Sequence, residues 1–182
     1  MKKIDWVIDP IHSELGFKIK HLMISNVSGT FSDYQAIVQT DNEDFSTARI
    51  EAKIKTGSIS TNNTGRDAHL KNADFFEADK YPEILFHSTK IEKKDSESFV
   101  LFGDLTMKGI TKPVKLNVEY SGITKDPWGG ERAGFLVTGK INRSEWGVNF
   151  NGVLETGGVV LSEEVRINSE IQLVKQAISV AA

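Results

Sequence analysis

Three residues near the N-terminus, Asp9, His12 and Ser13, are of the types that form a Ser-His-Asp catalytic triad. In such a triad the serine attacks, the histidine takes its proton and the aspartate orients the histidine. The spacing argues against this chemistry, because His12 and Ser13 are neighbours and point to opposite sides of an extended chain. The chain also has no Gly-x-Ser-x-Gly turn. We therefore expect a structural hydrogen-bonded cluster and no enzyme, with a hydrolase using His12 as an alternative.

The four histidines, His12, His21, His69 and His87, show no metal-binding spacing. They form no His-x-His pair and no His-Glu-x-x-His motif, although a zinc site assembled from distant histidines is conceivable. The chain has no cysteine, which excludes a thiolate nucleophile, a thiolate metal site and a disulfide framework. We expect no metal and no cofactor.

Two further polar groups have a structural and a functional interpretation. Arg66, Asp67 and His69 lie close together in one segment. We favour an internal salt link and a helix cap there, over a polar lip that holds a ligand head group. Arg143 and Trp146 follow the last residues of a predicted strand. We expect Arg143 to pair locally and Trp146 to plug or pack at the end of the fold.

The elements that must position these residues are mostly strands, because most of the chain alternates apolar and polar residues. Residues 48–55 and 114–120 do so without a fault, and a period of two is typical of a strand with one buried face. The main interruption is residues 64–82, where Asn63 or Thr64 can cap a short helix that starts at Gly65. These features predict a helical flap that lies against the sheet or over one end of it. The eight predicted strands are 14–21, 27–39, 45–56, 84–91, 99–107, 114–121, 134–142 and about 159–174.

Eight antiparallel strands joined mostly by short turns predict an all-β fold, either a closed barrel or a sandwich. An eight-stranded barrel has an interior that side chains fill or that holds one ligand. Small residues at predicted inward positions, Ala48, Ala52 and Gly139, leave room inside. Large aromatic side chains from facing strands could equally fill that room. The pattern by itself does not decide whether the interior is filled or contains a cavity.

Length and charge limit the classes of function. The chain has 182 residues and a formal net charge of -3, which suits one domain and disfavours nucleic-acid binding, since that needs a basic face. It contains no apolar stretch of roughly 18 residues, the length that a membrane span needs. Asp5 and Asp9 interrupt any signal-peptide core. We expect a cytoplasmic domain over residues 1–182, with an ordered core of about 4–175 and no stable membrane insertion.

Short motifs spread over most of the chain resemble the YceI-like family, whose members are known as polyisoprenoid-binding proteins. The resemblance runs from about Trp6 to Val174. Each motif is short, and the specificity lies in their order and spacing. The motifs are Trp6, Asp9-Pro10, His12-Ser13, Phe17, His21, Gly29-x-Phe31, Arg66-Asp67-x-His69-Leu70, Asp74-Phe75-Phe76, Tyr81-Pro82, Phe86-x-Ser88, Gly103-Asp104-Leu105-Thr106, Gly109-x-Thr111-x-Pro113-Val114 and Arg143-Ser144-x-Trp146-Gly147.

The resemblance implies an eight-stranded antiparallel, lipocalin-like barrel with a short helical insertion between strands 3 and 4. It also implies non-catalytic binding of a long isoprenoid or similar amphiphile in an apolar pore, and a homodimer as a possible assembly. Many members carry a signal peptide and are periplasmic, and this sequence departs from them there.

Combining the alternation with the resemblance gives one main functional hypothesis, the binding, sequestration or transport of a long-chain amphiphilic lipid. An isoprenoid quinone or prenol is the first ligand class, and a fatty acid or fatty amide the second. A stress-associated structural or interaction protein with an empty barrel is a further alternative. The residues expected to contact the ligand are Phe17, Ile19, Phe31, Ile50, Ala52, Ile54, Phe75, Phe76, Phe86, Leu116, Val118, Phe135, Val137, Ile141 and Trp146.

Overall fold

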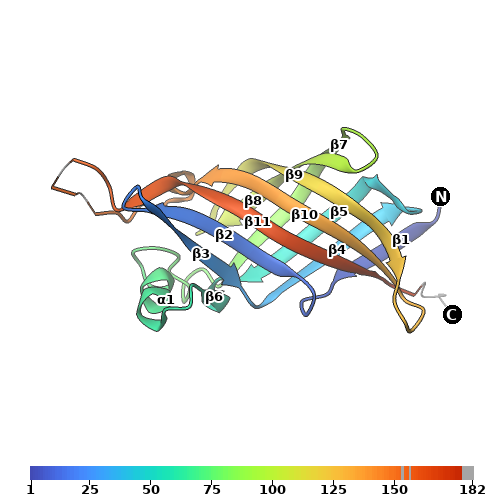
Figure 1. Ribbon diagram of the computed structural model, residues 1–182, viewed down its shortest axis with the longest axis horizontal. Coiled ribbons are helices and arrows are strands. Elements are labelled where there is room, and N and C mark those ends of the chain that lie inside the picture. Colours follow the sequence, from blue (N-terminus) through green and yellow to red (C-terminus); the bar gives the residue numbers. More distant parts are fainter. Residues whose placement is uncertain (153, 156, 178–182) are drawn as a thin grey trace.

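The fold is a single twisted antiparallel sheet, seen in a computed structural model that describes residues 1–152, 154–155 and 157–177 (Figure 1). Residues 178–182 of the predicted domain lie outside this description. The strands are β1 (Lys3–Ile8), β2 (Glu14–His21), β3 (Ser25–Phe31), β4 (Tyr34–Asp41), β5 (Asp44–Lys55), β6 (Ile59–Ser60), β7 (Glu83–Lys93), β8 (Ser98–Met107), β9 (Ile110–Lys125), β10 (Glu131–Asn142) and β11 (Leu161–Lys175). The helix α1 (Thr64–Lys71) and two 3-10 turns, Thr56–Ser58 and Arg143–Trp146, complete the elements.

Closure of the sheet depends on β11, which pairs with β10 on one side and with both β1 and β2 on the other. Trp6 in β1 lies opposite Lys175, and Gly16 in β2 lies opposite Asn168. The two short strands therefore follow one another along the same edge of β11. The order β1-β4-β5-β7-β8-β9-β10-β11 then closes into an eight-stranded antiparallel barrel. The predicted fold class is confirmed, with α1 inserted between the third and fourth barrel strands.

Two strand predictions need correction. The first predicted strand began at Glu14, and β1 was missed because it is only six residues long and Asp9-Pro10 directly follows it. The predicted strand 27–39 is two strands, β3 and β4, separated at Ser32 and Asp33. There the Ser32 N–H donates to the Ser58 carbonyl, and the next barrel strand is also interrupted, by the 3-10 turn between β5 and β6. The barrel wall therefore bends at one level across two adjacent strands.

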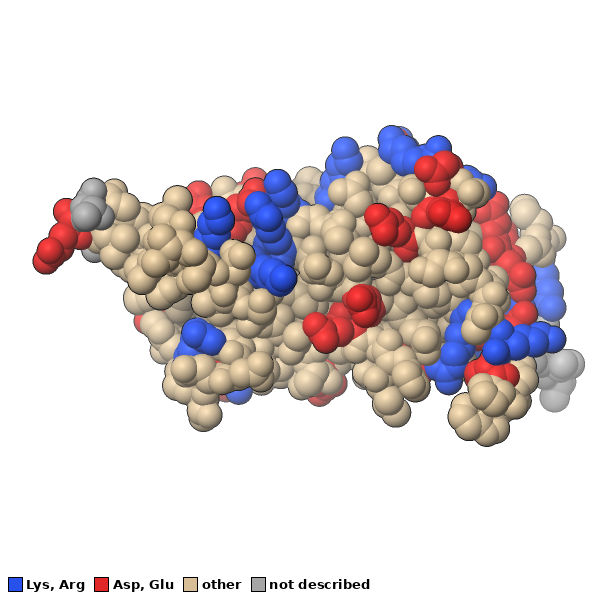
Figure 2. All heavy atoms as spheres, viewed as in Figure 1, with Lys and Arg blue, Asp and Glu red and all other residues tan. Residues whose placement is uncertain are grey.

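The alternation in β5 and β9 has the register that the sequence predicts. Ile50, Ala52 and Ile54 face the interior, whereas Arg49 and Lys53 are exposed on the outer face. In β9, buried Leu116 likewise alternates with exposed lysine and asparagine neighbours. The outward residues carry charges of both signs, and Figure 2 shows Lys and Arg interspersed with Asp and Glu over the visible face. One face of each strand is thus exposed to solvent, and the other face encloses an apolar interior.

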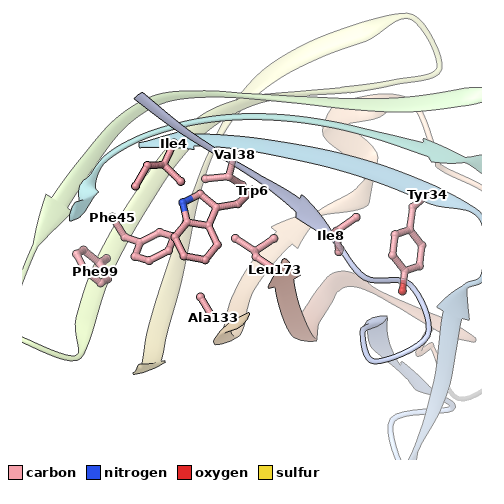
Figure 3. Close-up of a cluster of buried hydrophobic side chains, with 9 residues drawn as sticks. All are labelled: Ile4, Trp6, Ile8, Tyr34, Val38, Phe45, Phe99, Ala133 and Leu173. Atoms are coloured by element: carbon pink, nitrogen blue, oxygen red, sulfur yellow. The ribbon is translucent and has the colours of Figure 1, made fainter. Parts of the chain in front are cut away.

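An aromatic cluster fills the barrel end opposite α1 (Figure 3). Trp6 has no exposed surface, and its ring centroid lies 5.0 Å from that of Phe45. The Phe45 ring in turn contacts the rings of Tyr120 and Phe135 at 5.2 and 4.9 Å. The Trp6 indole N–H donates to the Thr40 hydroxyl at 3.0 Å, so its polar atom is satisfied inside the cluster. This end of the interior is a packed floor.

Candidate functional site

A cavity of about 580 Å³ occupies the interior of the barrel above this floor. Its wall is built almost entirely from apolar side chains, because each strand directs every second residue inward. A volume of this size is in the range of small-molecule sites. Among the residues predicted from the sequence, those on the wall are Phe17, Ile19, Phe31, Ile50, Ala52, Ile54, Phe75, Phe76, Phe86, Leu116, Val118, Phe135, Val137 and Ile141. Their contact with a ligand remains a prediction.

Trp146 is the one predicted site residue that does not line this cavity. Its side chain is 1% exposed and packs in a core cluster with Ile84 and Met107. The indole N–H donates to the Leu105 carbonyl at 2.9 Å. Trp146 therefore holds the 3-10 turn after β10 against the barrel, which agrees with its interpretation as a packing residue.

Further wall residues were not singled out from the sequence. Most of them follow the same alternation in β7, β8 and β11, and a systematic period-two count would have found them. Phe150 is different, because it lies after the 3-10 turn in a segment without periodicity, and only the fold brings it to the cavity. The added wall residues include Ile84, Phe99, Leu101, Leu105, Ile167 and Ile171.

Two glycines show how much of the interior is already filled. A Cβ atom at Gly29 would lie 2.2 Å from the Phe17 ring, and one at Gly103 would lie 2.4 Å from the Phe86 ring. Each aromatic ring therefore packs over a glycine of the neighbouring strand. Aromatic side chains do fill the space at these two glycines, yet a cavity remains beside Ala52, which lies between Ala36 and Phe86 on the adjacent strands.

The helix α1 is fixed by a compact hydrogen-bond network around Thr61. The Asn63 side chain accepts from the Arg66 N–H at 2.9 Å and caps the helix. The Arg66 guanidinium donates to the hydroxyl and the carbonyl of Thr61, at 2.7 and 2.8 Å. Asp67 accepts from the N–H and the hydroxyl of Thr61. The predicted cap is present, whereas the predicted salt link is replaced by bonds from both charged side chains to one threonine.

The residues after α1 bring two aromatic side chains to the cavity. Phe75 is 5% exposed, and its ring contacts those of His69 and Phe150 at 5.0 and 5.2 Å. The Phe76 ring meets the Phe31 ring edge-on, with 6.2 Å between the ring centroids. The segment therefore covers the α1 end of the barrel with apolar rings on its inner side.

Comparison with known proteins agrees with this architecture. The profile of the YceI-like domain matches residues 6–173. The chain belongs to the YceI-like family. A UPF0312 protein of Staphylococcus aureus (strain USA300) is 44% identical over 169 residues, which are 92% of this chain and 96% of that protein.

Several solved structures share the fold. A Campylobacter jejuni YceI protein is 37% identical, with a TM-score of 0.74 over 88% of this chain and 91% of its own. Burkholderia cenocepacia BcnA, at 21% identity, has a TM-score of 0.78 over 91% and 98% of the two chains. A polyisoprenoid binding domain from Saccharophagus degradans, at 14% identity, has a TM-score of 0.63 over 95% and 98%. The last two show similarity of fold alone.

Two features are absent from the described part of this YceI-like chain. No helix there is long and apolar enough to span a membrane. No group of three or more His, Cys, Asp or Glu side chains there is arranged to hold a metal ion.

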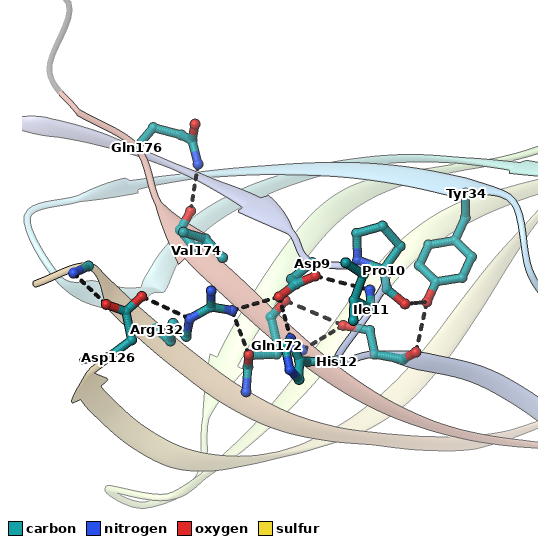
Figure 4. Close-up of polar contacts among 12 residues, drawn as sticks. Asp9, Pro10, Ile11, His12, Tyr34, Asp126, Arg132, Gln172, Val174 and Gln176 are labelled. Atoms are coloured by element: carbon teal, nitrogen blue, oxygen red, sulfur yellow. Dashed lines mark hydrogen bonds and ion pairs between the residues drawn. The ribbon is translucent and has the colours of Figure 1, made fainter. Parts of the chain in front are cut away.

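The Asp9 cluster lies outside the cavity and joins the loop after β1 to β10, across the intervening strand β11 (Figure 4). Asp9 accepts from His12 at 2.7 Å and from Arg132 at 2.6 Å, and Arg132 also donates to Asp126. The hydrogen bond from His12, with that from Arg132, lowers the pKa of Asp9 to about 2. Ser13 bonds the backbone of Gln172 and, among the described residues, makes no bond to His12. The three triad residue types are thus not arranged for nucleophilic attack.

The Asp9–Arg132 pair gives a pH-dependent prediction. Asp9→Asn should lower the free energy of unfolding at pH 7 by about 1–3 kcal/mol, because it weakens a charge-assisted bond to Arg132, which is 22% exposed. The pKa of Asp9 falls from its ordinary value of 3.8 to about 2 in the folded protein. The contribution of Asp9 to the free energy of unfolding is therefore complete above pH 3.8 and is lost as the pH falls through about 2. Urea denaturation from pH 7 to pH 2 should show the two curves converging, and a constant difference would contradict this origin.

His12 bonds the same Asp9 carboxylate but is more exposed than Arg132. Its side chain is 58% exposed, so it forms no buried polar link. His12→Ala should therefore cost less than about 1 kcal/mol.

Proposed function

We propose that this protein binds a long-chain isoprenoid or similar amphiphilic lipid inside the barrel, without catalysis. The observation that carries the proposal is the cavity of about 580 Å³ with an almost wholly apolar wall. Burial of a hydrocarbon chain contributes roughly 0.8 kcal/mol per CH₂ group, which is ample before the ordering costs are subtracted. The solved neighbour named as a polyisoprenoid binding domain supports the isoprenoid class.

The geometry favours a linear chain over a compact ligand. The wall runs from Phe45 and Leu173 at the packed floor to His69 and Phe150 at the α1 end, and so follows much of the barrel length. Isoprenoid quinones and prenols, and fatty acids or amides, all present such a chain with a polar group at one end. Sequestration or transport of one of these lipids is the activity that we propose. A cytoplasmic location and a homodimer remain expectations, and the cavity argument does not depend on them.

Native mass spectrometry of the protein purified without detergent tests the proposal. We expect a mass excess over the polypeptide that disappears on denaturation and is recovered in an organic extract. A protein that carries no lipid, and takes up neither prenol nor fatty acid when these are added, would favour the empty-barrel alternative. Turnover of an acyl ester that His12→Ala abolishes would favour the hydrolase.

A further inference from the structure

Most polar side chains on the cavity wall gather at its α1 end. Arg143 donates through Nε to the Ser162 carbonyl at 3.0 Å, and through Nη1 to the carbonyls of Val148 and Phe150 at 2.7 and 2.9 Å. The ring of Phe150 lies 4.9 Å from that of His69 on α1. Arg143 and His69, which are 74 positions apart in the chain, are therefore linked through one intervening residue.

Two other wall residues belong to the same end. Arg66 is one turn before His69 on α1 and is bound to Thr61. His21 ends β2 opposite Leu161, the residue before Ser162, to which Arg143 donates. Arg66 and His21 line the cavity together with His69 and Arg143. The opposite end of the wall is the packed aromatic floor described above, so the cavity is polar at one end.

The charged side chains that line this polar end are basic. Of the described residues that line the cavity, none is Asp or Glu. The acidic side chains nearby bond to other groups: Asp67 to Thr61, Asp74 to His69 at 2.8 Å, and Glu163 to Asn142 at 3.4 Å. In the hydrogen bonds of the described residues, the guanidinium groups of Arg66 and Arg143 donate only to neutral oxygens. The outer face, in contrast, carries both signs (Figure 2).

Arg143 holds its charge where water is scarce. The residue is 5% exposed, and this burial lowers the pKa of its guanidinium, while the charge of nearby Glu163, which makes no ion pair with it, acts in the opposite direction. Its second terminal nitrogen, Nη2, has no hydrogen-bond partner among the described residues, yet it is not sealed inside the protein. A buried cation without a carboxylate partner is destabilising, and a bound anion would offset this effect. Guanidinium groups are well suited to carboxylate and phosphate because they offer several donors in one plane.

We propose that the α1 end of the cavity binds an anionic head group, a carboxylate or a phosphate, through Arg66 and Arg143. The proposal rests on the proposed function, since the apolar tail of the same ligand would lie along the barrel wall. The preferred ligands are then fatty acids or prenyl phosphates. The neutral prenols, quinones and amides of the same chain length would bind more weakly.

Pairs of lipids that differ only in head group test this directly. One pair is palmitate and hexadecanol, and the other is a prenyl monophosphate and the prenol of equal length, each titrated against protein from which endogenous lipid has been removed. We expect the anionic member of at least one pair to bind ten-fold or more tightly at low ionic strength. Added salt should reduce that ratio, because it screens the charge. The pair with the larger ratio identifies carboxylate or phosphate as the preferred source.

Charge-removing variants locate the effect. Arg66→Gln and Arg143→Gln should bring the anion-to-alcohol ratio toward one, whereas Arg66→Lys should keep most of it. Arg49→Gln removes the same charge from the exposed outer face of β5 and should leave the ratio unchanged. The ratio is the useful readout, because a general loss of structure weakens both members of a pair. If Arg143→Gln does not fold, Arg66→Gln and the wild-type salt series still decide the question.

The possible outcomes distinguish failure of the anionic site from failure of the proposed lipid binding. Equal binding of both members by the wild type would overturn the anionic site and leave the lipid carrier in place. A ratio that survives both glutamine variants would also overturn it. Binding of no lipid at all would remove the proposed function and this inference together.

Discussion

Ala52→Trp should empty the barrel of lipid while leaving the barrel folded. Ala52 lies on the cavity wall between Ala36 and Phe86, and an indole there needs volume that the bound chain would occupy. The barrel should tolerate the change, because the new side chain enters unfilled space and displaces no packed neighbour. We expect the lipid extracted per mole of protein to fall at least ten-fold, measured by mass spectrometry alongside far-ultraviolet circular dichroism.

The neighbouring residue supplies the control. Lys53→Trp adds the same indole one position along β5, but on the exposed outer face, and should keep the wild-type lipid content. The double change Phe75→Ala and Phe76→Ala should lose less lipid than Ala52→Trp, mainly through faster release. Equal lipid in Ala52→Trp and wild type would show that the interior is not the binding site. Unfolding of Ala52→Trp would mean that the interior is already packed.

Trp6→Ala should cause the largest loss of stability among single changes in the floor of the barrel. The side chain is fully buried against Phe45, and its indole N–H bonds the hydroxyl of buried Thr40. Removal of a buried tryptophan leaves a cavity and costs about 3–5 kcal/mol. Here it also takes a bonding partner from Thr40. Urea denaturation followed by circular dichroism should show this decrease in the free energy of unfolding.

Trp128→Ala is the matched control for that experiment. Trp128 lies in the turn between β9 and β10 and is 87% exposed. Its removal should change the free energy of unfolding by less than about 0.5 kcal/mol. Similar losses for the two tryptophan variants would contradict the role of the aromatic floor in closing the barrel.

The two ends of the barrel have different roles in the proposed carrier. The aromatic floor around Trp6 and Phe45 closes one end and contributes stability through buried area. The α1 end combines aromatic rings with cations that lack an acidic partner on the wall. A lipid bound tail-first would satisfy both environments, since its chain would meet the apolar wall and its head group would stay near Arg66 and Arg143.

The sequence was sufficient to predict the class of fold and much of the cavity wall. Strict alternation in β5 and β9 determines which side chains share a face, because the side-chain period of a strand is two whatever the rest of the fold does. The helical flap could also be predicted from the sequence, since the Asn63 cap and the break in alternation are local signals. The eight-stranded count followed because seven of the eight predicted strands match continuous elements of the barrel.

Tertiary structure alone decided the features that depend on distant residues. β1 becomes a barrel strand because β11 and β4 pair with it, and the break at Ser32 matches a break in the next strand. Asp9 meets Arg132 across the sheet, 123 positions away in the chain. Phe150 joins His69 and Arg143 at the α1 end although no periodicity marks it. Alternation specifies which face a side chain occupies, but only closure of the barrel determines which residues meet there, because those contacts join strands far apart in the chain.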